Sequence, residues 1–304
     1  MSKRVILAGG SGFLGESLTN FLLGRGYEVT VLSRGKEGFK DGAEFIRWDG
    51  KNMDARWVDR IDGSCAVVNF TGKSVNCIYT EKNKREIIES RLDSVRVLKD
   101  AVLKAEQPPP VFVQAGSLAI FGDTEEVCDE ESPLADGFSP EVCKLWEGEF
   151  FSGDRLPHTR QVLLRIGFAL GRDGGALEPL VKLARMGLGG TIGSGRQYIS
   201  WLHIDDLNSM FLNAIEDPEY SGVYNATGPH PVRNKEFMQT LRKVLNKGWS
   251  PPAPSPFVKA GAYLFMRAEP ELALTGRNCV PKRLLDNGFA FQYTDLEKAL
   301  RDLV

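Results

Sequence analysis

The stretch "LAGGSGFLGESL" (residues 7–18) constrains the fold more than any other part of the chain. It places glycines at positions 9, 12 and 15, after the apolar run Val5–Ala8 and before a segment with helical periodicity. Glycine inside a helix or strand costs about 0.5–1 kcal/mol relative to alanine, and an ordinary turn needs only one. Three glycines between a strand and a helix indicate the loop that binds the phosphates of a dinucleotide.

Each glycine of this loop has a separate expected role. Gly9 allows a tight turn, Gly12 lets a pyrophosphate approach the backbone, and Gly15 lets the helix and the strand pack closely. The N-terminus of the helix then offers unpaired N–H groups and the positive end of its dipole. The alternative is a strand-to-helix turn with a purely structural role.

The end of the second expected strand indicates which dinucleotide binds. In NAD enzymes an Asp or Glu about twenty residues beyond the loop bonds to the ribose hydroxyls. Here Ser33 and Arg34 follow the strand Glu28–Leu32 instead. A guanidinium pairs with a 2′-phosphate that a carboxylate would repel. The sequence therefore favours NADP over NAD, unless Arg34 is only a solvated loop residue.

Short apolar runs alternate with longer amphipathic segments through the first half of the chain. This alternation predicts an α/β fold, a Rossmann-type doubly wound parallel sheet with a smaller C-terminal substrate portion. The expected strands are Val5–Ala8, Glu28–Leu32, Ala66–Phe70, Val111–Ala115 and Gln161–Arg165, and the expected helices are Leu14–Leu23, Glu81–Ala105 and Glu141–Phe151.

The composition of the sequence changes near residue 172. Glycine-rich segments follow that point, and the proline-rich bend "SPPAPSP" comes later, at residues 250–256. We therefore expect an NADP-binding domain over residues 1–171 and a mixed substrate and C-terminal portion over 172–304. Segments near 199–230, namely Ile199–His203 and Gly222–Asn225, are expected to complete the sheet. Helical patterns cover Phe257–Met266 and Leu296–Val304.

Composition narrows the classes of partner. A formal net charge of −2 gives no overall electrostatic reason to bind nucleic acid or an anionic membrane. No apolar run approaches the roughly 18 residues of a membrane span. The five cysteines are widely spaced without a Cys-x-x-Cys pair, so we expect no metal site. They also suit a reducing compartment, and we expect a cytoplasmic protein.

Further motifs resemble those of the extended short-chain dehydrogenases/reductases. "VVNFTGK" ends a strand with Asn69, Thr71 and Gly72, at the edge where such sheets bind ligands. An ordinary turn with no role in binding would have a similar sequence. "GSLAIFGD" resembles the end of the superfamily's fifth strand, which places the catalytic hydroxyl at Ser117. "SWLHIDDL" and "GVYNATGP" resemble later motifs of the extended members.

Long stretches resemble one atypical branch of that superfamily, the "epimerase family" of subfamily 39U. They are "WEGEFF", "LLRIGFALGRDGGAL", "GLGGTIGSGRQYISWLHIDDL" and "VPKRLLDNGFAFQYTDLEKAL", and the likeness runs from residue 4 to about 302. The resemblance implies NADP(H) and leaves the substrate open. The residues expected to contact the cofactor are Gly9, Ser11, Gly12, Phe13, Leu14, Gly15, Ser33, Arg34, Asn69, Thr71, Gly72, Gly116, Arg165 and Gly167.

The chain departs from the superfamily at its proton relay. Active members carry Tyr-x-x-x-Lys on one helix face, where the lysine lowers the pKa of the phenol. No tyrosine of this chain has a lysine four positions later, and "FSPEVCKLWEGEFF" contains none. Other candidates for a role in the site, each with an ordinary structural alternative, are Ser117, Cys143, Lys144, Tyr198 and His203. Asp205 and Asp206 are expected to cap a helix.

Basic residues late in the chain hint at an acidic substrate. Arg277 and the pair Lys282–Arg283 lie in the segment expected to close over the cleft. The loop "GLGGTIGSGRQ", with Arg196, fits either an anionic or sugar-like ligand or a structural hairpin.

Two functions follow from these observations. The first is an NADP-dependent oxidoreductase or epimerase-like enzyme that acts on a small polar molecule. The second is a non-catalytic NADPH-binding module, which the missing Tyr-x-x-x-Lys favours. We expect a monomer or a homodimer in either case.

Overall fold

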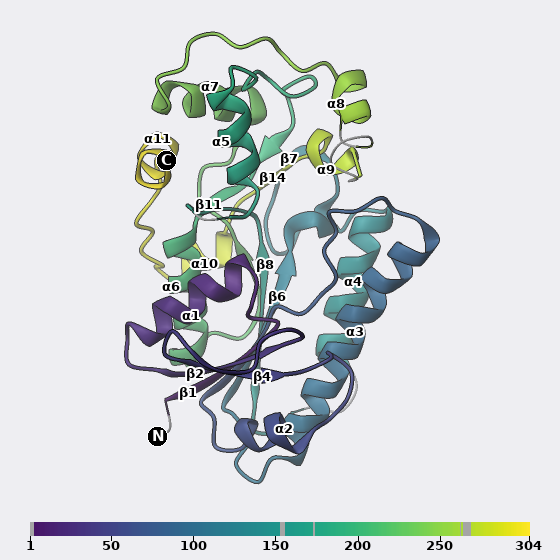
Figure 1. Cartoon of the computed structure of the whole chain (residues 1–304), viewed down its shortest axis with the longest axis vertical. Coiled ribbons are helices and arrows are strands. Elements are labelled where there is room, and N and C mark those ends of the chain that lie inside the picture. Colours follow the sequence, from purple (N-terminus) through teal and green to yellow (C-terminus); the bar gives the residue numbers. More distant parts are fainter. Residues whose placement is uncertain (1–2, 153–155, 173, 262, 264–268) are drawn as a thin grey trace.

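The computed structural model describes residues 3–152, 156–172, 174–261, 263 and 269–304 (Figure 1). The strands are β1 (Arg4–Ala8), β2 (Glu28–Ser33), β3 (Gly38–Lys40), β4 (Ala43–Arg47), β5 (Ala66–Asn69), β6 (Val111–Ser117), β7 (Thr124–Cys128), β8 (Arg160–Ile166), β9 (Phe168–Leu170), β10 (Tyr198–Ile199), β11 (Trp201–His203), β12 (Gly222–Ala226), β13 (Val232–Arg233) and β14 (Arg277–Cys279). The helices are α1 (Phe13–Leu23), α2 (Ala55–Ile61), α3 (Glu81–Lys104), α4 (Phe138–Phe151), α5 (Leu177–Arg185), α6 (Ile204–Glu216), α7 (Asn234–Val244), α8 (Ser255–Gly261), α9 (Glu271–Leu274), α10 (Lys282–Asp286) and α11 (Leu296–Leu303), with a 3-10 turn η1 (Leu118–Phe121).

Within the described ranges the main sheet has eight strands in the order β12-β8-β6-β5-β1-β2-β4-β3. Its strands run parallel except β3, which is antiparallel to β4. The strand order reverses on either side of β1, which is the topology of a doubly wound sheet. The prediction of an α/β Rossmann-type fold is therefore confirmed.

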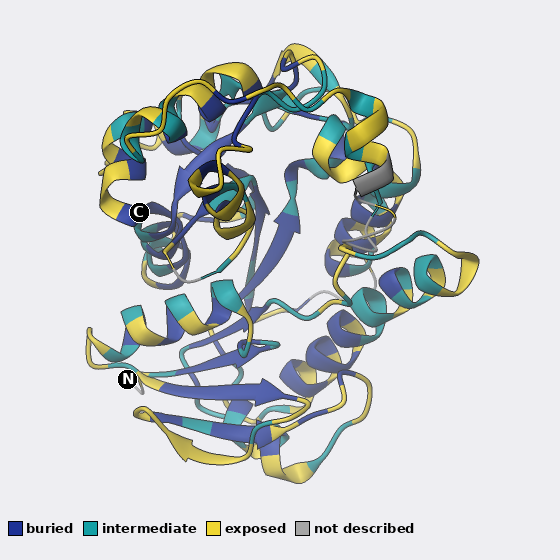
Figure 2. Ribbon diagram, turned by 45° about the horizontal axis from the view of Figure 1, so that its top comes forward, coloured by how far each residue is buried: buried dark blue, intermediate teal, exposed yellow. Residues whose placement is uncertain are grey.

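The alternation of side chains along each strand explains why helices cover both faces. Val5 and Leu7 of β1 pack on the face covered by α1 and α6. Ile6 and Ala8 point the other way and pack against α2, α3 and α4. The inner strands of the sheet are buried, while the edge strand β3 and the outer sides of the helices are exposed (Figure 2). Continuous apolar strands of this kind need cover on both sides.

The expected strands and helices of the first half are confirmed to within three residues at each end. The strands β3, β4, β7 and β9 and the helix α2 were not predicted from the sequence. The strand β4, "AEFIR", is short and carries a charge at its second and last positions, so its apolar pattern is weak. None of the helices in the described part of the chain is long and apolar enough to cross a membrane.

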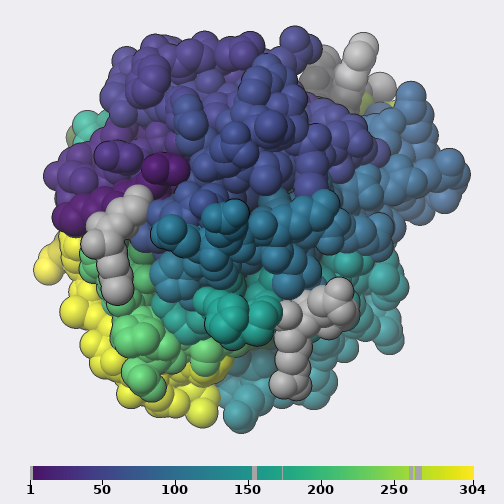
Figure 3. Space-filling view, turned by 90° about the horizontal axis from the view of Figure 1, so that it is seen from below, coloured from purple at the N-terminus to yellow at the C-terminus, as the bar shows by residue number. Residues whose placement is uncertain are grey.

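The later half of the chain adds one strand to the main sheet and builds a second layer beside it. β12 lies at the edge of the sheet beside β8. The segment Ile199–His203 was expected in the same sheet, but β11 pairs with β9 and β10 with β13. A separate apolar core joins α5, α7 and α11. Seen from below (Figure 3), C-terminal residues (yellow) lie beside other residues of the later half (green) and next to the start of the chain (purple).

The remaining helical expectations concern the end of the chain. The helix α11 is confirmed at Leu296–Leu303. The expected helix Phe257–Met266 is described only in part: α8 covers Ser255–Gly261, while residues 262 and 264–268 lie outside the described residues.

A buried ion pair links the sheet to α4. The guanidinium of Arg165 on β8 donates to both carboxylate oxygens of Glu147, at 2.9 and 2.8 Å. The side chains are only 6% and 11% exposed. Charges at such a depth are tolerated when they are paired with good geometry.

We expect Glu147→Gln to lower the free energy of unfolding by about 3–5 kcal/mol, because it leaves the charge of Arg165 buried without a partner. Denaturant titration measures the change. The double variant Glu147→Met/Arg165→Met removes both charges and should recover most of the loss; a double variant as unstable as the single one would show that lost packing, not the charge, is responsible.

Candidate functional site

The glycine loop between β1 and α1 combines two very close approaches with one open position. A Cβ atom on Gly15 would lie 2.4 Å from Cα of Gly10, and one on Gly9 would lie 2.8 Å from Oγ1 of Thr71. Gly9 also has a φ of +71°, which favours glycine. Nothing lies within 4 Å of the corresponding position on Gly12. Gly15 therefore packs against the loop itself, whereas the sequence analysis expected it to pack against the strand.

The open position lies at the start of α1, where backbone donors are available. Gly12 is the N-cap residue, and no side chain caps the helix. The first intrahelical bond runs from N–H of Glu16 to the carbonyl of Gly12. The amides of Phe13 and Leu14 accordingly have no acceptor within the helix. Free amides, a positive dipole end and open space together suit a phosphate group.

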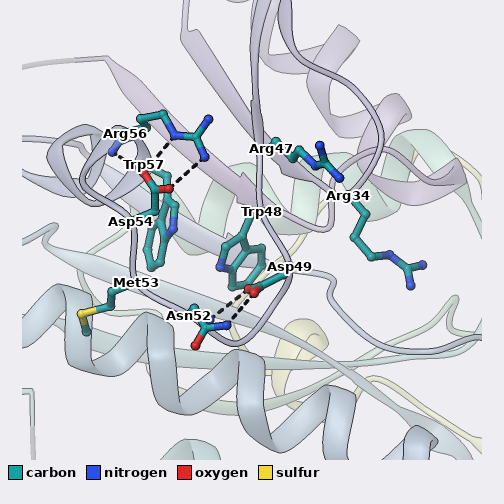
Figure 4. Close-up of a pocket in the computed structure, with 9 residues that line it drawn as sticks. All are labelled: Arg34, Arg47, Trp48, Asp49, Asn52, Met53, Asp54, Arg56 and Trp57. Carbon is teal, nitrogen blue, oxygen red and sulfur yellow. Dashed lines mark hydrogen bonds and ion pairs between the residues drawn. The ribbon is translucent and has the colours of Figure 1, made fainter.

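Two arginines lie at the carboxyl ends of the adjacent strands β2 and β4. The strands run parallel with Ser33 opposite Arg47, and Arg34 follows Ser33. Arg34 and Arg47 line a hollow of about 420 Å³ (Figure 4). Arg56 in the same hollow is paired with Asp54 at 2.8 Å.

Neither Arg34 nor Arg47 has a hydrogen-bond or ion-pair partner in the described part of the chain, although Arg56 and Asp49 beside them do. Arg47 escaped the sequence analysis because its strand was not recognised. Had β4 been recognised, the basic residue at its end, opposite Ser33 of β2, would have indicated Arg47 as a second candidate. Ser33 itself is buried, and its Oγ accepts the N–H of Lys36 at 3.3 Å.

The segment after β5 shapes the loop from the other side. Asn69 is fully buried; its Nδ2 donates to Oε1 of Gln114 and its Oδ1 accepts the N–H of Thr71. Gly72 lies against the guanidinium of Arg91, with 3.0 Å between its Cβ position and Cζ. Oγ1 of Thr71 is buried beside Gly9 without a hydrogen-bond partner. Asn69 therefore acts within the protein, while Thr71 retains an unused polar atom at the loop.

A second cavity, of about 530 Å³, opens between the end of β6 and the C-terminal portion. Ser117 and Gly167 line it, together with Tyr198 from the later half of the chain. Oγ of Ser117 accepts the N–H of Ala119 at 3.2 Å, which leaves its hydroxyl proton free to donate. Gly116 lies against Leu163, at 2.8 Å from its Cβ position.

The structure separates the other candidates for a proton relay from this cavity. Cys143 is buried, and burial raises the pKa of its thiol to about 12. Lys144 pairs with Asp136 at 3.3 Å. His203 lines a different hollow, beside Asp205 and Asp302. Tyr198 is the candidate that lines the cavity with Ser117.

The expected caps of α6 need correction. Asp205 and Asp206 were expected to cap the helix, but His203 is the N-cap residue and its Nδ1 accepts the N–H of Asp205 at 3.1 Å. Asp206 instead accepts the N–H groups of Gln292 and Tyr293. The two aspartates thus lie in the first turn, and Asp206 ties the segment before α11 to α6.

The basic residues of the later half fall into two groups. Arg196 pairs with Glu125, Lys282 with Asp286, and Arg283 donates to backbone carbonyls. Arg277 lines the 530 Å³ cavity. The loop that contains Arg196 closes a turn in which the N–H of Gly195 donates to the carbonyl of Ile192 at 3.1 Å, and Ile192 also bridges to Ala253. Arg165, expected at the cofactor, is committed to Glu147.

The glycine contacts predict different costs for the same substitution. Gly15→Ala should lower the free energy of unfolding by about 1–3 kcal/mol, because its Cβ would overlap backbone atoms of Gly10. Gly12→Ala, the matched control, should cost less than about 1 kcal/mol. Thermal or denaturant unfolding of both variants measures the difference, and equal stabilities would contradict the packing described for the loop.

Comparison with known proteins places this chain among similar full-length sequences. A family model described as "NAD dependent epimerase/dehydratase family" matches residues 5–141, and one described as a domain of unknown function matches residues 253–303. The human "Epimerase family protein SDR39U1" is 37% identical over 309 residues, which cover 99% of each chain. A chloroplastic SDR39U1 homolog from Arabidopsis thaliana is 33% identical and covers 99% of this chain and 86% of its own.

A solved structure agrees with the sequence comparison. The crystal structure of human SDR39U1 (isoform 2) with NADPH superposes with a TM-score of 0.86 at 34% identity. The alignment covers 99% of this chain and 98% of the human one.

Proposed function

The chain belongs to the epimerase family that includes human SDR39U1, and from this premise we propose that it is an NADPH-dependent oxidoreductase. One combination of features carries the proposal. A phosphate group can approach the backbone at Gly12, and Arg34 and Arg47, at the ends of β2 and β4, have no side-chain partner among the described residues. NADPH in the human structure supports the choice of cofactor.

The residues present fit the cofactor at three points. The pyrophosphate would lie over Gly12, against the first amides of α1 and the unused Oγ1 of Thr71. The 2′-phosphate would lie between Arg34 and Arg47, whose guanidiniums suit a dianion. Ser11 belongs to the same loop. The nicotinamide would lie toward the cavity that Ser117 and Gly167 line.

The cavity residues supply the positioning and the proton. When bound, the reduced nicotinamide provides a hydride to a substrate carbonyl carbon; a proton must reach the oxygen, giving an alcohol and the oxidised cofactor. Ser117 is held by Ala119 and can donate a hydrogen bond that orients this oxygen, and it can relay a proton to the oxygen when a bound water replaces the serine proton in the same step. Tyr198 also lines the cavity, with the guanidinium of Arg233 over its ring at 4.6 Å from the ring centroid. In this arrangement Ser117 and water take the place of the Tyr-x-x-x-Lys pair.

The second candidate is an NADPH-binding module without turnover. It is favoured by the composition of α4, "FSPEVCKLWEGEFF", which lacks the tyrosine of active relatives. A cavity of about 530 Å³ beside Ser117 supports the enzyme instead, because a protein that only stores or senses NADPH needs no space for a substrate.

The compartment and the assembly are part of the same proposal. All five cysteines are free, which suits a reducing compartment such as the cytoplasm. The long helices α3 and α4 pack side by side (Figure 1), and Leu145 and Phe151 of α4 are exposed. A monomer or a homodimer through this pair of helices fits these features.

Charge reversal at the strand ends tests the choice of cofactor. Arg34→Asp or Arg47→Asp should weaken NADPH binding tenfold or more while changing NADH binding much less, since each lost charge-assisted bond is worth about 1.5–3 kcal/mol. Isothermal titration calorimetry with both cofactors measures the preference. Arg185→Asp, on the exposed side of α5, is the matched control and should leave it unchanged. If all three variants keep the wild-type preference, these arginines do not bind the 2′-phosphate.

The role of Ser117 is tested by removing and then retaining its hydroxyl. Ser117→Ala should lower kcat on the order of 10²-fold, the low end for a positioned proton-transfer group, with nearly unchanged NADPH affinity. Ser117→Thr keeps the hydroxyl and should retain most of the turnover. NADPH oxidation against a panel of carbonyl compounds provides the assay. Equal rates for wild type and Ser117→Ala would move the proton donor elsewhere.

A further inference from the structure

Arg277 lies on a closely packed part of the cavity wall. It begins β14, which runs parallel to β7. Its carbonyl accepts from Oγ of Ser200 at 2.7 Å, and the N–H of the preceding Gly276 donates to Oδ1 of Asp123 at 2.8 Å. A Cβ on Gly276 would lie 2.2 Å from the carbonyl oxygen of Tyr198, so the backbone is closely packed. The position of Arg277 is therefore set by its neighbours rather than by its own charge.

The guanidinium of Arg277 has no counter-ion in the described part of the protein. Its Nε is buried without a hydrogen-bond partner. Asp123 and Glu271 interact with the guanidinium of Arg277 only by long-range electrostatic attraction, without an ion pair. Burial lowers the pKa of Arg277. The thiols of Cys143 and Cys279 cannot neutralise it, because burial raises the pKa of each to about 12. A half-buried cation without a counter-ion is less favourable than a paired one, and a ligand in the cavity can supply the missing partner.

Other arginines near this part of the fold are compensated within the chain. Arg196 and Arg233 share the carboxylate of Glu125. Arg165 is bound by Glu147 through both of its carboxylate oxygens. Arg277 differs from them in facing a cavity instead of an acid. An uncompensated charge in a cleft indicates a binding site more often than a structural one.

The rest of the wall shows what kind of molecule fits. Most lining side chains are apolar, and they include Leu118, Ile166, Phe168, Leu180, Ile192 and Leu272. Glu269 is the carboxylate among the described lining residues, and its Oε2 already accepts the N–H of Tyr79 at 3.3 Å. A ligand of this cavity thus meets apolar side chains between Ser117 at one place and the cation of Arg277 at another, and the wall also carries the polar residues Asn76, Gln197, Tyr198, Ser200, Asn234 and Thr275.

We infer that Arg277 binds a phosphate or carboxylate group of the substrate, and that this substrate is a carbonyl compound whose anionic group is joined to an apolar portion. The planar guanidinium can hold two oxygens of either anion at once. The inference deepens the proposed function, on which it rests for the reduction at Ser117. Binding of the anion to the cavity does not itself need NADPH.

Stability without ligand gives the first test. Arg277→Met removes an uncompensated half-buried charge with a side chain of similar reach, so we expect a higher Tm than wild type in anion-free buffer. Arg185→Met on the exposed side of α5 should leave Tm unchanged. A lower Tm for Arg277→Met would mean that Arg277 is a structural residue and would overturn the inference.

Binding of simple anions gives the second test. Hexanoate, inorganic phosphate and neutral hexanamide are titrated into wild type, Arg277→Met and Arg277→Lys at constant ionic strength, with Tm and calorimetry as readouts. At least one anion should bind wild type and raise its Tm, while hexanamide should bind at least tenfold more weakly. Arg277→Met should lose at least tenfold in anion affinity, and Arg277→Lys should lose less. The tighter of hexanoate and phosphate identifies the anionic group.

Two outcomes of the titration would overturn the inference: no binding of either anion, or equal anion affinity in wild type and Arg277→Met. NADPH affinity, measured on the same samples, should be the same in both. If wild type does not bind NADPH, the proposed function fails while the anion result still stands. If NADPH binds and the anions do not, only the assignment of Arg277 fails.

Discussion

The rest of the site depends on the contact between Gly15 and Gly10, where helix α1 meets the loop before it. Because a Cβ on Gly15 would lie 2.4 Å from Cα of Gly10, glycine alone lets the helix begin this close to the end of β1. That position directs the free amides of α1 across the carboxyl edge of the sheet. Thr71 and the ends of β2 and β4 face the same edge.

The two halves of the chain contribute different things to the function. The parallel sheet presents the expected cofactor contacts at its carboxyl ends, as doubly wound folds do. The later half supplies Tyr198 and Arg277, which lie on short strands outside the main sheet. Asn208 of α6 helps to join these halves, because its Nδ2 donates to Oγ of Ser17 on α1 at 2.9 Å. The proposed cofactor contacts and the proposed substrate contacts therefore come largely from different parts of the chain.

Features with a local sequence pattern could be predicted, and features that depend on weak or distant signals could not. The glycine loop and the strand before it are local patterns, and the Rossmann-type sheet they indicated is confirmed. Arg34 could be proposed because it follows a strong apolar strand, whereas Arg47 could not, since the short β4 carries charges at two of its five positions. The cap of α6 was misassigned because Asp is a commoner cap than His, and only the packed structure shows His203 accepting the bond.

The remaining features of the site depend on contacts between segments that are separate in the sequence. Nothing in the sequence around Arg277 distinguishes it from Arg196, Lys282 or Arg283, yet the fold pairs the last three and leaves Arg277 in a cavity. Arg165 was expected at the cofactor, but its buried pairing with Glu147 depends on α4, which lies elsewhere in the sequence. Charge compensation of this kind can be seen only once distant segments are brought together.

The measurement that tests the central claim most directly is the affinity of the wild-type protein for NADPH and NADH at several salt concentrations. Two free guanidiniums at the strand ends predict that NADPH binds at least tenfold more tightly than NADH, with a difference that narrows as salt screens the charges. Equal affinities at low salt, or a preference indifferent to salt, would contradict the account of a 2′-phosphate bound by Arg34 and Arg47.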